Sequence, residues 1–518
     1  ISQLNTSFTE RNWELVVGVN KDLGKDFTLN VIAGGNIMTQ HYDYNNVVGE
    51  GVVIPGLAVI NNTSTKTVSI SESNKRINSL FATAELGYKG FLYLNATGRN
   101  DWFSTLNPNN NSYLYPSVSG SFVFSELFHM PEFIDFGKFR VGYASVGGDT
   151  DPYQLDLTYE LLGFNYNGYP LGNISQPTVP NRLLRPLSVS EFEVGFDVRF
   201  FKNRLGIDMA FYDKLTKNDI TQETLTATSG YNGASVNVGK LRNRGAELLI
   251  YGTPVQTSAF SWDISLNGSY NKSKVLKISN QASELNLGSR GKASVRLIEG
   301  EEYAQIVGPA IERNEQGQDI ISNDGLNIVN RGNVVSFGSG IHKWNMGITN
   351  TINYKSFALS FLVDGKFGAK LYSVSSYELD HRGMTVKSLL GRADGAILPG
   401  VKQSDGKPND IMVTPSMAGN RLIVINRREA LNDYLYNASF IKLRSIALTY
   451  NFSKGVLNSV RFIKGASISL VGNNLALLMT HAKQIDPDGN WSTGNAQGIE
   501  ASNLPPIKSY GVDIKLKF

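Results

Sequence analysis

The sequence alternates most clearly in one nine-residue stretch, Tyr510-Gly511-Val512-Asp513-Ile514-Lys515-Leu516-Lys517-Phe518. Apolar side chains occupy every second position, and glycine, aspartate and lysine lie between them. Successive side chains of a β-strand point to opposite faces, so this stretch predicts a strand with one apolar and one polar face. The same period of two recurs in 192–200, 205–212 and 260–266.

About fifteen segments of this kind are present, most near the ~10 residues that a tilted membrane strand needs. The expected strands are 12–20, 27–39, 76–88, 91–102, 113–125, 138–147, 190–201, 204–215, 243–253, 259–271, 342–354, 357–372, 439–452, 465–476 and 509–518. Two all-β architectures have such strands. A soluble sandwich buries the apolar face against a second sheet, whereas a membrane barrel exposes it to lipid.

The lengths of the connections favour the barrel. Short connections, such as 89–90 and 202–203, take turns with long ones, which are 40–75, 148–189, 216–242, 272–341, 373–438 and 477–508. Three intermediate connections, 103–112, 126–137 and 453–464, blur the pattern. Outer-membrane barrels have short periplasmic turns and long extracellular loops, and a sandwich has no reason for this regularity. The sequence therefore predicts an all-β, transmembrane antiparallel β-barrel.

The composition excludes several other classes. The 518 residues include 49 basic and 45 acidic side chains, a net charge of +4, and no cysteine. No run of about 18 apolar residues occurs, so a transmembrane helix is not expected. The absence of cysteine excludes disulfide scaffolds and thiolate sites. The nearly balanced charge argues weakly against a nucleic-acid partner. Because barrels are long single domains, residues 1–518 are expected to belong to one domain.

Aromatic residues are expected to form the girdles that flank the lipid-facing band of a barrel. Trp13, Trp102 and Trp344 lie near expected strand ends on the side of the long loops, and Trp262 lies next to a short turn. Phe518 closes the last alternating strand on its apolar face. An aromatic residue there is similar to the insertion signal of outer-membrane barrels.

The strand count predicts that the chain is part of a larger barrel. With short connections in the periplasm, the segment 12–20 runs toward the periplasm and so does 509–518. Fifteen strands is an odd number, whereas single-chain bacterial barrels have an even number with both termini in the periplasm. At least one strand is therefore expected before Ile1, and the chain is expected to be the C-terminal part of the barrel.

Short motifs in a fixed order carry a resemblance to a known family. They are Arg99-Asn100-Asp101-Trp102, Asn111 to Ser119, Phe139 to Gly147, Asp151-Pro152-Tyr153, Glu191 to Asp197, Phe201 to Leu205, Asn243 to Leu248, Ala438 to Arg444 and Val471 to Leu475. Together they resemble the SusC/RagA-type TonB-dependent outer-membrane transporters. Each motif is short, but their co-occurrence in order from about residue 75 to 518 is specific.

The resemblance implies a barrel of about 22 strands with a plugged lumen. About seven strands, the plug domain and the TonB-contacting segment would then precede this chain. It also implies a bacterial outer-membrane location, with lipid and lipopolysaccharide around the barrel. A SusD-like surface lipoprotein would act as a lid, and TonB would supply energy to import oligosaccharides or oligopeptides. The alternatives are a passive porin, and a surface adhesin or secretion-associated barrel that imports nothing.

The expected loops contain aromatic and amide side chains that suit sugar rings or extended peptides. The candidate substrate-binding residues are Tyr42, Tyr44, Tyr153, Tyr166, Tyr169, Tyr231, Asn232 and Trp491. Loops that fold over the barrel mouth or hold a lid would have the same composition. Charges at alternate strand positions, such as Asp263, Lys442 and Arg444, are expected to face a wet lumen.

Motifs for catalysis or cofactor binding are not evident. The five histidines are far apart, and no nucleophile elbow, P-loop or dinucleotide fingerprint occurs. Asp486, Asp488 and Asn490 resemble the opening of a calcium loop, but no glutamate completes it, so a Pro-Gly turn is favoured. Asp149 and Asp151 are turn formers rather than an acid and base pair. Neither an enzyme nor a bound cofactor is expected.

Overall fold

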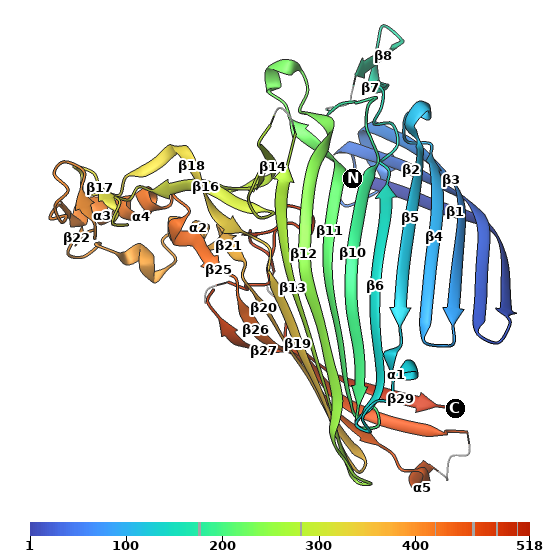
Figure 1. Cartoon of the computed structure of the whole chain (residues 1–518). Helices are drawn as coiled ribbons and strands as arrows, with labels where there is room; N and C mark the ends of the chain where they lie inside the picture. Colours follow the sequence, from blue (N-terminus) through green and yellow to red (C-terminus); the bar gives the residue numbers. More distant parts are fainter. Residues whose placement is uncertain (175–177, 280–281, 420, 458–461, 483–484, 505) are drawn as a thin grey trace. The chain divides into compact units, whose positions relative to one another are not determined.

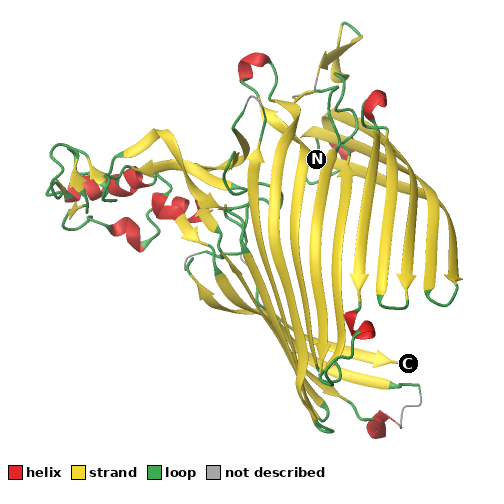
Figure 2. Cartoon of the chain, in the orientation of Figure 1, coloured by secondary structure: helices red, strands yellow, loops and turns green. Residues whose placement is uncertain are grey.

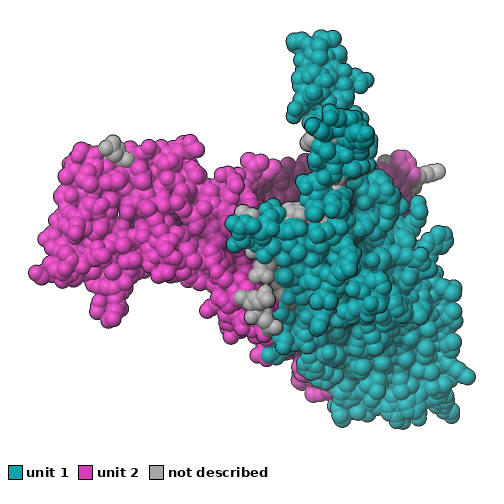
Figure 3. Space-filling model, turned by 90° about the horizontal axis from the view of Figure 1, so that it is seen from above, with its two compact units in different colours: residues 1–129, 138–195, 212–242 teal, residues 130–137, 196–211, 243–518 magenta. Residues whose placement is uncertain are grey.

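A computed structural model describes residues 1–174, 178–279, 282–419, 421–457, 462–482, 485–504 and 506–518. Contacts divide the chain into two compact units, which are coloured teal and magenta in Figure 3. Unit 1 contains 1–129, 138–195 and 212–242, and unit 2 contains 130–137, 196–211 and 243–518. Strands predominate in the cartoon, and the helices are short (Figure 2).

One large antiparallel sheet contains all fifteen strands that the alternation predicts. Its strands follow one another in chain order (Figure 1): β1 (Ser2–Leu23), β2 (Phe27–Val52), β3 (Thr63–Tyr88), β4 (Leu92–Phe103), β5 (Ser112–Phe122), β6 (Ile134–Gly148), β10 (Leu187–Phe200), β11 (Leu205–Thr224), β12 (Gly233–Gln256), β13 (Phe260–Lys277), β19 (Trp344–Tyr354), β20 (Phe357–Phe367), β26 (Phe440–Asn451), β27 (Gly465–Thr480) and β29 (Ser509–Lys517). A short strand, β9 (Thr178–Val179), adds to β12 in parallel.

The pairing register separates the two faces of the sheet. In unit 1, one row across five strands is apolar: Val19, Val31, Ala84, Ala96 and Val118. The next row is polar: Asn20, Asn30, Glu85, Asn95 and Ser119. Unit 2 repeats this, with an apolar row of Trp262, Ile352, Leu359, Leu448, Leu470 and Val512. We call the apolar side the outer face and the polar side the inner face.

The predicted loop 40–75 is wrong for most of its length. β2 continues to Val52 and β3 begins at Thr63, and their register is continuous from Phe27 to Glu50. Both faces of this extension carry polar side chains, so the alternation that marks a half-buried strand is lost. Threonine, tyrosine and valine nevertheless favour extended backbone, and the ladder of hydrogen bonds continues.

The predicted loop 216–242 is wrong in the same way, because β11 runs to Thr224 and β12 begins at Gly233. Three further predicted loops, 272–341, 373–438 and 477–508, contain folded structure. Their elements are β14 (Glu284–Arg290), β15 (Ala293–Ile298), β16 (Gln305–Ile311), β17 (Ile320–Ile321), β18 (Val329–Ser339), β21 (Lys370–Ser373), α2 (Val374–His381), η4 (Val386–Leu389), β22 (Ala396–Ile397), β23 (Val401–Lys402), β24 (Met412–Val413), α3 (Pro415–Gly419), α4 (Leu422–Arg427), η5 (Asn432–Tyr434), β25 (Leu435–Asn437) and β28 (Ile499–Glu500). We call these elements of unit 2 the loop body.

The loop body has two hydrophobic cores of its own. Tyr372, Leu431 and Ile499 are fully buried in the larger core, which joins all three connections. Ile321 and Val413 centre the smaller one. None of the described helices is long and apolar enough to cross a membrane.

One of the expected girdle residues does not lie at a strand end. Trp13 lies in the middle of β1 because that strand is longer than predicted. Trp102, Trp262 and Trp344 do lie within three residues of a strand end, and the exposed Phe518 ring stacks on Phe462 with 6.1 Å between centroids. Membrane placement of these five side chains remains a prediction.

Candidate functional site

The inner face of unit 1 carries a charged cluster near the strand ends that lie away from the short turns. Lys75 of β3 donates to Asp149, which follows β6, with Nζ 2.8 Å from Oδ1. The Thr105 hydroxyl donates to the other carboxylate oxygen, also at 2.8 Å. Asp149 is therefore an ion-pair partner that joins the end of β6 to β3, and its noncatalytic role stays a prediction.

A small hydrophobic core supports this cluster. Phe103, Leu106, Tyr115 and Leu184 are buried together on the inner side of the sheet. Gly147 allows this packing, because a Cβ at that position would lie 2.4 Å from the Tyr115 ring. The core holds the chain that follows β6 against the sheet.

A cleft of about 200 Å³ opens beside this core. Its lining combines hydroxyl and amide groups with aromatic and aliphatic surface: Asn74, Ser104, Thr105, Pro152, Tyr153, Leu155, Asp156 and Thr158. The Asn74 backbone N–H donates to the Tyr153 hydroxyl at 3.3 Å, while about half of the Tyr153 side chain stays exposed. The structure thus places Tyr153, one of the predicted substrate-binding residues, in this cleft, and its binding role stays a prediction.

A tyrosine-bearing hairpin follows the cleft residues in the chain. It consists of β7 (Tyr159–Tyr166) and β8 (Tyr169–Ile174), joined by a two-residue turn, Asn167 and Gly168, that has positive φ at both residues. Tyr166 and Tyr169 are direct cross-strand partners and are 68% and 74% exposed. Tyr159 and Leu161 are exposed to a similar degree. The sequence identified Tyr166 and Tyr169 but not the hairpin that pairs them.

The other predicted residues lie elsewhere. Tyr42 and Tyr44 belong to the extended part of β2 rather than to a loop, and both are on its inner face. Tyr231 and Asn232 form the turn before β12, where the Asn232 carbonyl accepts from the Leu225 N–H at 3.1 Å. Trp491 is in the loop body of unit 2, where its ring lies against Gly288. The structure therefore distributes the eight predicted residues over several surfaces.

Two of the three residues that resemble a calcium loop, Asp486 and Asp488, belong to an ion-pair network in unit 2. Lys442 of β26 donates to Asp486 at 2.7 Å. Asp488 binds Lys366 of β20 at 2.9 Å and Arg444 at 3.2 Å. The Asn490 side chain accepts from the Gly498 N–H at 2.8 Å. In the part of the chain that the structure describes, no group of three or more His, Asp or Glu side chains could hold a metal ion.

This network determines the charge state of Asp488. Burial raises the pKa of Asp488, but the hydrogen bonds and charges of Lys366, Lys442 and Arg444 outweigh burial and hold that pKa below its ordinary value of 3.8. Arg444 also binds Asp364 of β20 through both nitrogens of one edge, at 3.0 and 2.6 Å. The network fastens the loop 485–490 to the inner face, so these strand charges are paired with loop carboxylates rather than solvated by a wet lumen as the sequence predicted.

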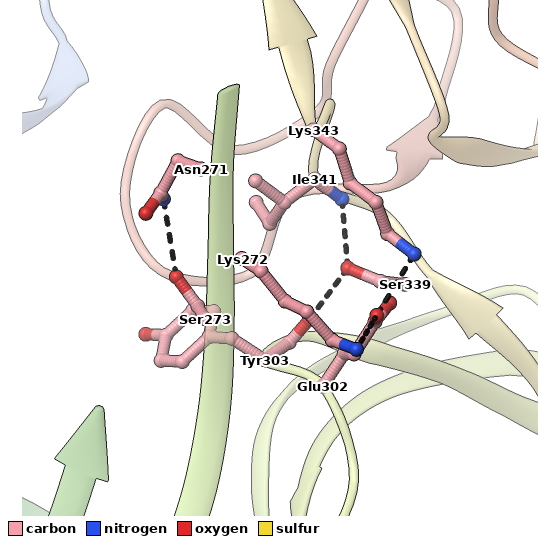
Figure 4. Close-up of a pocket in the computed structure, with 8 residues that line it drawn as sticks. All are labelled: Asn271, Lys272, Ser273, Glu302, Tyr303, Ser339, Ile341 and Lys343. Carbon is pink, nitrogen blue, oxygen red and sulfur yellow. Dashed lines mark hydrogen bonds and ion pairs between the residues drawn. The ribbon is translucent and has the colours of Figure 1, made fainter. Parts of the chain in front are cut away.

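A second polar contact joins the loop body to β13 within unit 2. The Lys343 ammonium lies 2.8 Å from the Glu302 carboxylate, and the Lys272 ammonium lies 3.9 Å from the same oxygen. Figure 4 shows both lysines directed at this carboxylate. The Ser339 hydroxyl donates to the Tyr303 carbonyl at 2.6 Å. The cavity between these residues is about 10 Å³, which is room for a single water molecule. It is too small for a substrate.

A comparison of the sequence with models of protein families agrees with the large two-faced sheet. The family model described as "TonB dependent receptor-like, beta-barrel" matches residues 2–380. The chain belongs to the TonB-dependent receptor family. The predicted resemblance is thus confirmed, and membership places this receptor barrel in the bacterial outer membrane and in a family that is not enzymatic.

Individual relatives of this receptor are distant but extensive. TonB-dependent receptor P26 of Formosa agariphila is 25% identical over 88% of the chain and 48% of its own length. TonB-dependent receptor SusC of Bacteroides thetaiotaomicron is 23% identical over 74% of the chain and 37% of its own length. The structure of the RagAB peptide transporter superposes on the whole chain with a TM-score of 0.81 at 19% identity, covering 56% of that transporter chain. The receptor chain spans about half the length of the relatives it matches.

Proposed function

We propose that this receptor chain is the C-terminal barrel portion of a SusC-like transporter that imports oligosaccharides or oligopeptides with TonB-supplied energy. The remaining strands, the plug and the TonB-contacting segment would come from the rest of a full-length protein. The observation that carries the proposal is the two-faced sheet, apolar outside and charged inside, in a chain of this family. The relatives' greater length supports the additional parts.

The β7–β8 hairpin supports the second part of the proposal, a SusD-like lipoprotein lid. Exposed tyrosines combine a large apolar area with a hydrogen-bonding hydroxyl, and they are frequent anchors of protein interfaces. Tyr159, Tyr166 and Tyr169 concentrate that chemistry on one short element with little core of its own. A lid that contacts the hairpin would cover the cleft at Tyr153.

Uptake by the full-length receptor tests the transport proposal. Cells that carry the intact gene are expected to take up labelled oligopeptides or oligosaccharides, and deletion of either the receptor or TonB is expected to abolish that uptake. The two ligand classes are compared in parallel, which identifies the substrate. Uptake that persists without TonB would support a passive porin instead.

The lid proposal is tested by replacing Tyr166→Ser and Tyr169→Ser together. Each tyrosine is expected to contribute about 1 kcal/mol or more to an interface, so the pair should lower lipoprotein affinity by at least about tenfold. The measurement is the amount of lipoprotein that co-purifies with full-length receptor. The matched control is Tyr510→Ser with Tyr143→Ser, because these exposed tyrosines lie in sheet strands. Equal recovery of the lipoprotein from both variants would contradict a lid at the hairpin.

A further inference from the structure

The outer face of β1 to β4 contains a groove with tryptophan at both ends. Trp13, Ile37, Asn78 and Trp102 form one cross-strand row. The groove around this row has a volume of about 660 Å³, and Leu15 and Leu80 extend its apolar lining. The Trp13 and Leu80 side chains are 71% and 60% exposed, so the lining is open.

Two arginines lie one row further from the short turns. Arg11 and Arg76 are both register partners of Thr39, and they share the outer face with Trp13 and Asn78. Two strand spacings put their backbones about 10 Å apart, within reach of one anionic group. The Arg76 Nε donates to Asn78 at 2.9 Å. Within the described residues, neither guanidinium forms an ion pair.

The distance from the short turns to the Trp13 row can be compared with the height of the apolar band of an outer-membrane barrel. Near the short turns, the outer face carries Phe27 against Tyr88, with ring centroids 4.7 Å apart. Ten residues separate Phe27 from Ile37, which is about 33 Å along a strand. A tilt of about 40° reduces this to roughly 25 Å, the height of the apolar band of an outer-membrane barrel. The Trp13 row therefore coincides with the outer edge of the band.

The positive charge of the two arginines indicates which kind of lipid group lies beside them, just beyond that edge. The long connections mark the extracellular side, so Arg11 and Arg76 lie at the headgroup level of the outer leaflet. Guanidinium groups bind phosphate oxygens in pairs. The carboxylates on this face of β1 to β4 lie further out, where His41 contacts Asp43 at 3.0 Å and Glu72 at 3.6 Å. Asp43 is four residues beyond Thr39, about 13 Å along the strand, and leaves the arginine row positive.

We propose that this groove binds one lipopolysaccharide molecule. The lipid A phosphate lies between Arg11 and Arg76, and an acyl chain occupies the groove between Trp13 and Trp102. The outer leaflet of the bacterial outer membrane is the source of this ligand. The site is separate from any transport path, because it lies on the face opposite to the charged inner cluster.

The test uses full-length receptor purified from outer membranes in a mild detergent. Native mass spectrometry is expected to detect lipopolysaccharide on the unmodified receptor. Arg11→Gln with Arg76→Gln should lower its retention by at least about tenfold, because the phosphate loses both of its charged hydrogen-bond donors. The matched control is Arg182→Gln with Arg331→Gln, which removes the same charge from side chains that are 75% and 71% exposed.

Two additional measurements complete the test. Arg11→Lys with Arg76→Lys keeps the charge and is expected to retain an intermediate amount of lipopolysaccharide, which separates a binding defect from a folding defect. Purified lipopolysaccharide, its dephosphorylated form and phosphatidylglycerol are then added to delipidated receptor. Stronger binding of the phosphorylated lipopolysaccharide supports the site. Equal binding of all three, or equal retention by the glutamine variant and its control, would overturn the proposal.

Discussion

At the residue scale, Lys442 links the sheet to a loop 44 residues away in the sequence. Its side chain is 6% exposed, and its ammonium contacts Asp486 at 2.7 Å and Asp488 at 3.7 Å. The strand pattern predicted that this charge faces a wet lumen; the lysine does lie on the polar inner face, but the loop around Asp486 buries it. The pattern does not contain the identity of the partner, because Asp486 reaches Lys442 only after the loop folds back.

Replacing Lys442→Met is expected to loosen the loop around Asp486. Removing one member of a largely buried ion pair costs about 3 kcal/mol, because the other charge remains unpaired. Hydrogen exchange of residues 485–490 should therefore accelerate by about 100-fold in the full-length receptor. Lys515→Met is the control, since that lysine is 77% exposed and pairs loosely with Asp513. Equal exchange in the two variants would show that the ion pair does not hold the loop.

At the scale of elements, the loop body shows that a long connection between sheet strands can be a folded structure rather than a loop. Its helices and strands are short, and their apolar residues have no clear period. They are buried because three connections, far apart in sequence, supply one core around Tyr372, Leu431 and Ile499. Asp433 fastens its centre, because Arg427 binds that carboxylate through two nitrogens at 2.7 Å each and Lys387 binds it at 2.9 Å.

The loop body is expected to lose protection in acid. Burial raises the pKa of Asp433, but Arg427 and Lys387 outweigh it and hold that pKa below its ordinary value of 3.8. A lowered folded-state pKa means that this stabilisation is complete above pH 3.8 and is lost as the pH falls through the folded-state value. Hydrogen exchange of residues 421–437, corrected for the intrinsic effect of pH, measures this.

Asp433→Asn is the control for the acid prediction. That variant should be less protected at neutral pH and should lack the additional loss below pH 3.8. The same acid step in both proteins would assign it to another carboxylate. Asp488, whose pKa is also lowered, is distinguished by following residues 485–490 separately.

At the scale of the whole molecule, the two faces of the sheet determine where the protein resides. Val118 and Ser119 are adjacent on β5, and both are exposed in the isolated chain. Val118 belongs to an apolar row and Ser119 to a polar row. If the outer face contacts lipid, the Val118 side chain lies in hydrocarbon and the Ser119 side chain lies in water.

Lysine at these two positions distinguishes the faces. Val118→Lys is expected to cost about 2–4 kcal/mol of folding free energy in a bilayer, because the ammonium enters hydrocarbon. Ser119→Lys should cost little, because the inner face is wet. The measurement is the refolding equilibrium of full-length receptor in lipid vesicles. An equal cost for the two substitutions would contradict the assignment of the outer face to lipid.

The sequence by itself determined the strands and their two faces, because alternation is a local property that each segment carries alone. It identified the fifteen sheet strands and the inward position of Lys442. Only the tertiary structure decided that three long connections share a core, that Asp486 and Asp488 bind lysine and arginine, and that Tyr166 opposes Tyr169. It also placed Trp13 and Trp102 in one row beneath Arg11 and Arg76. These arrangements depend on pairing register and on contacts between distant segments, which no local period records.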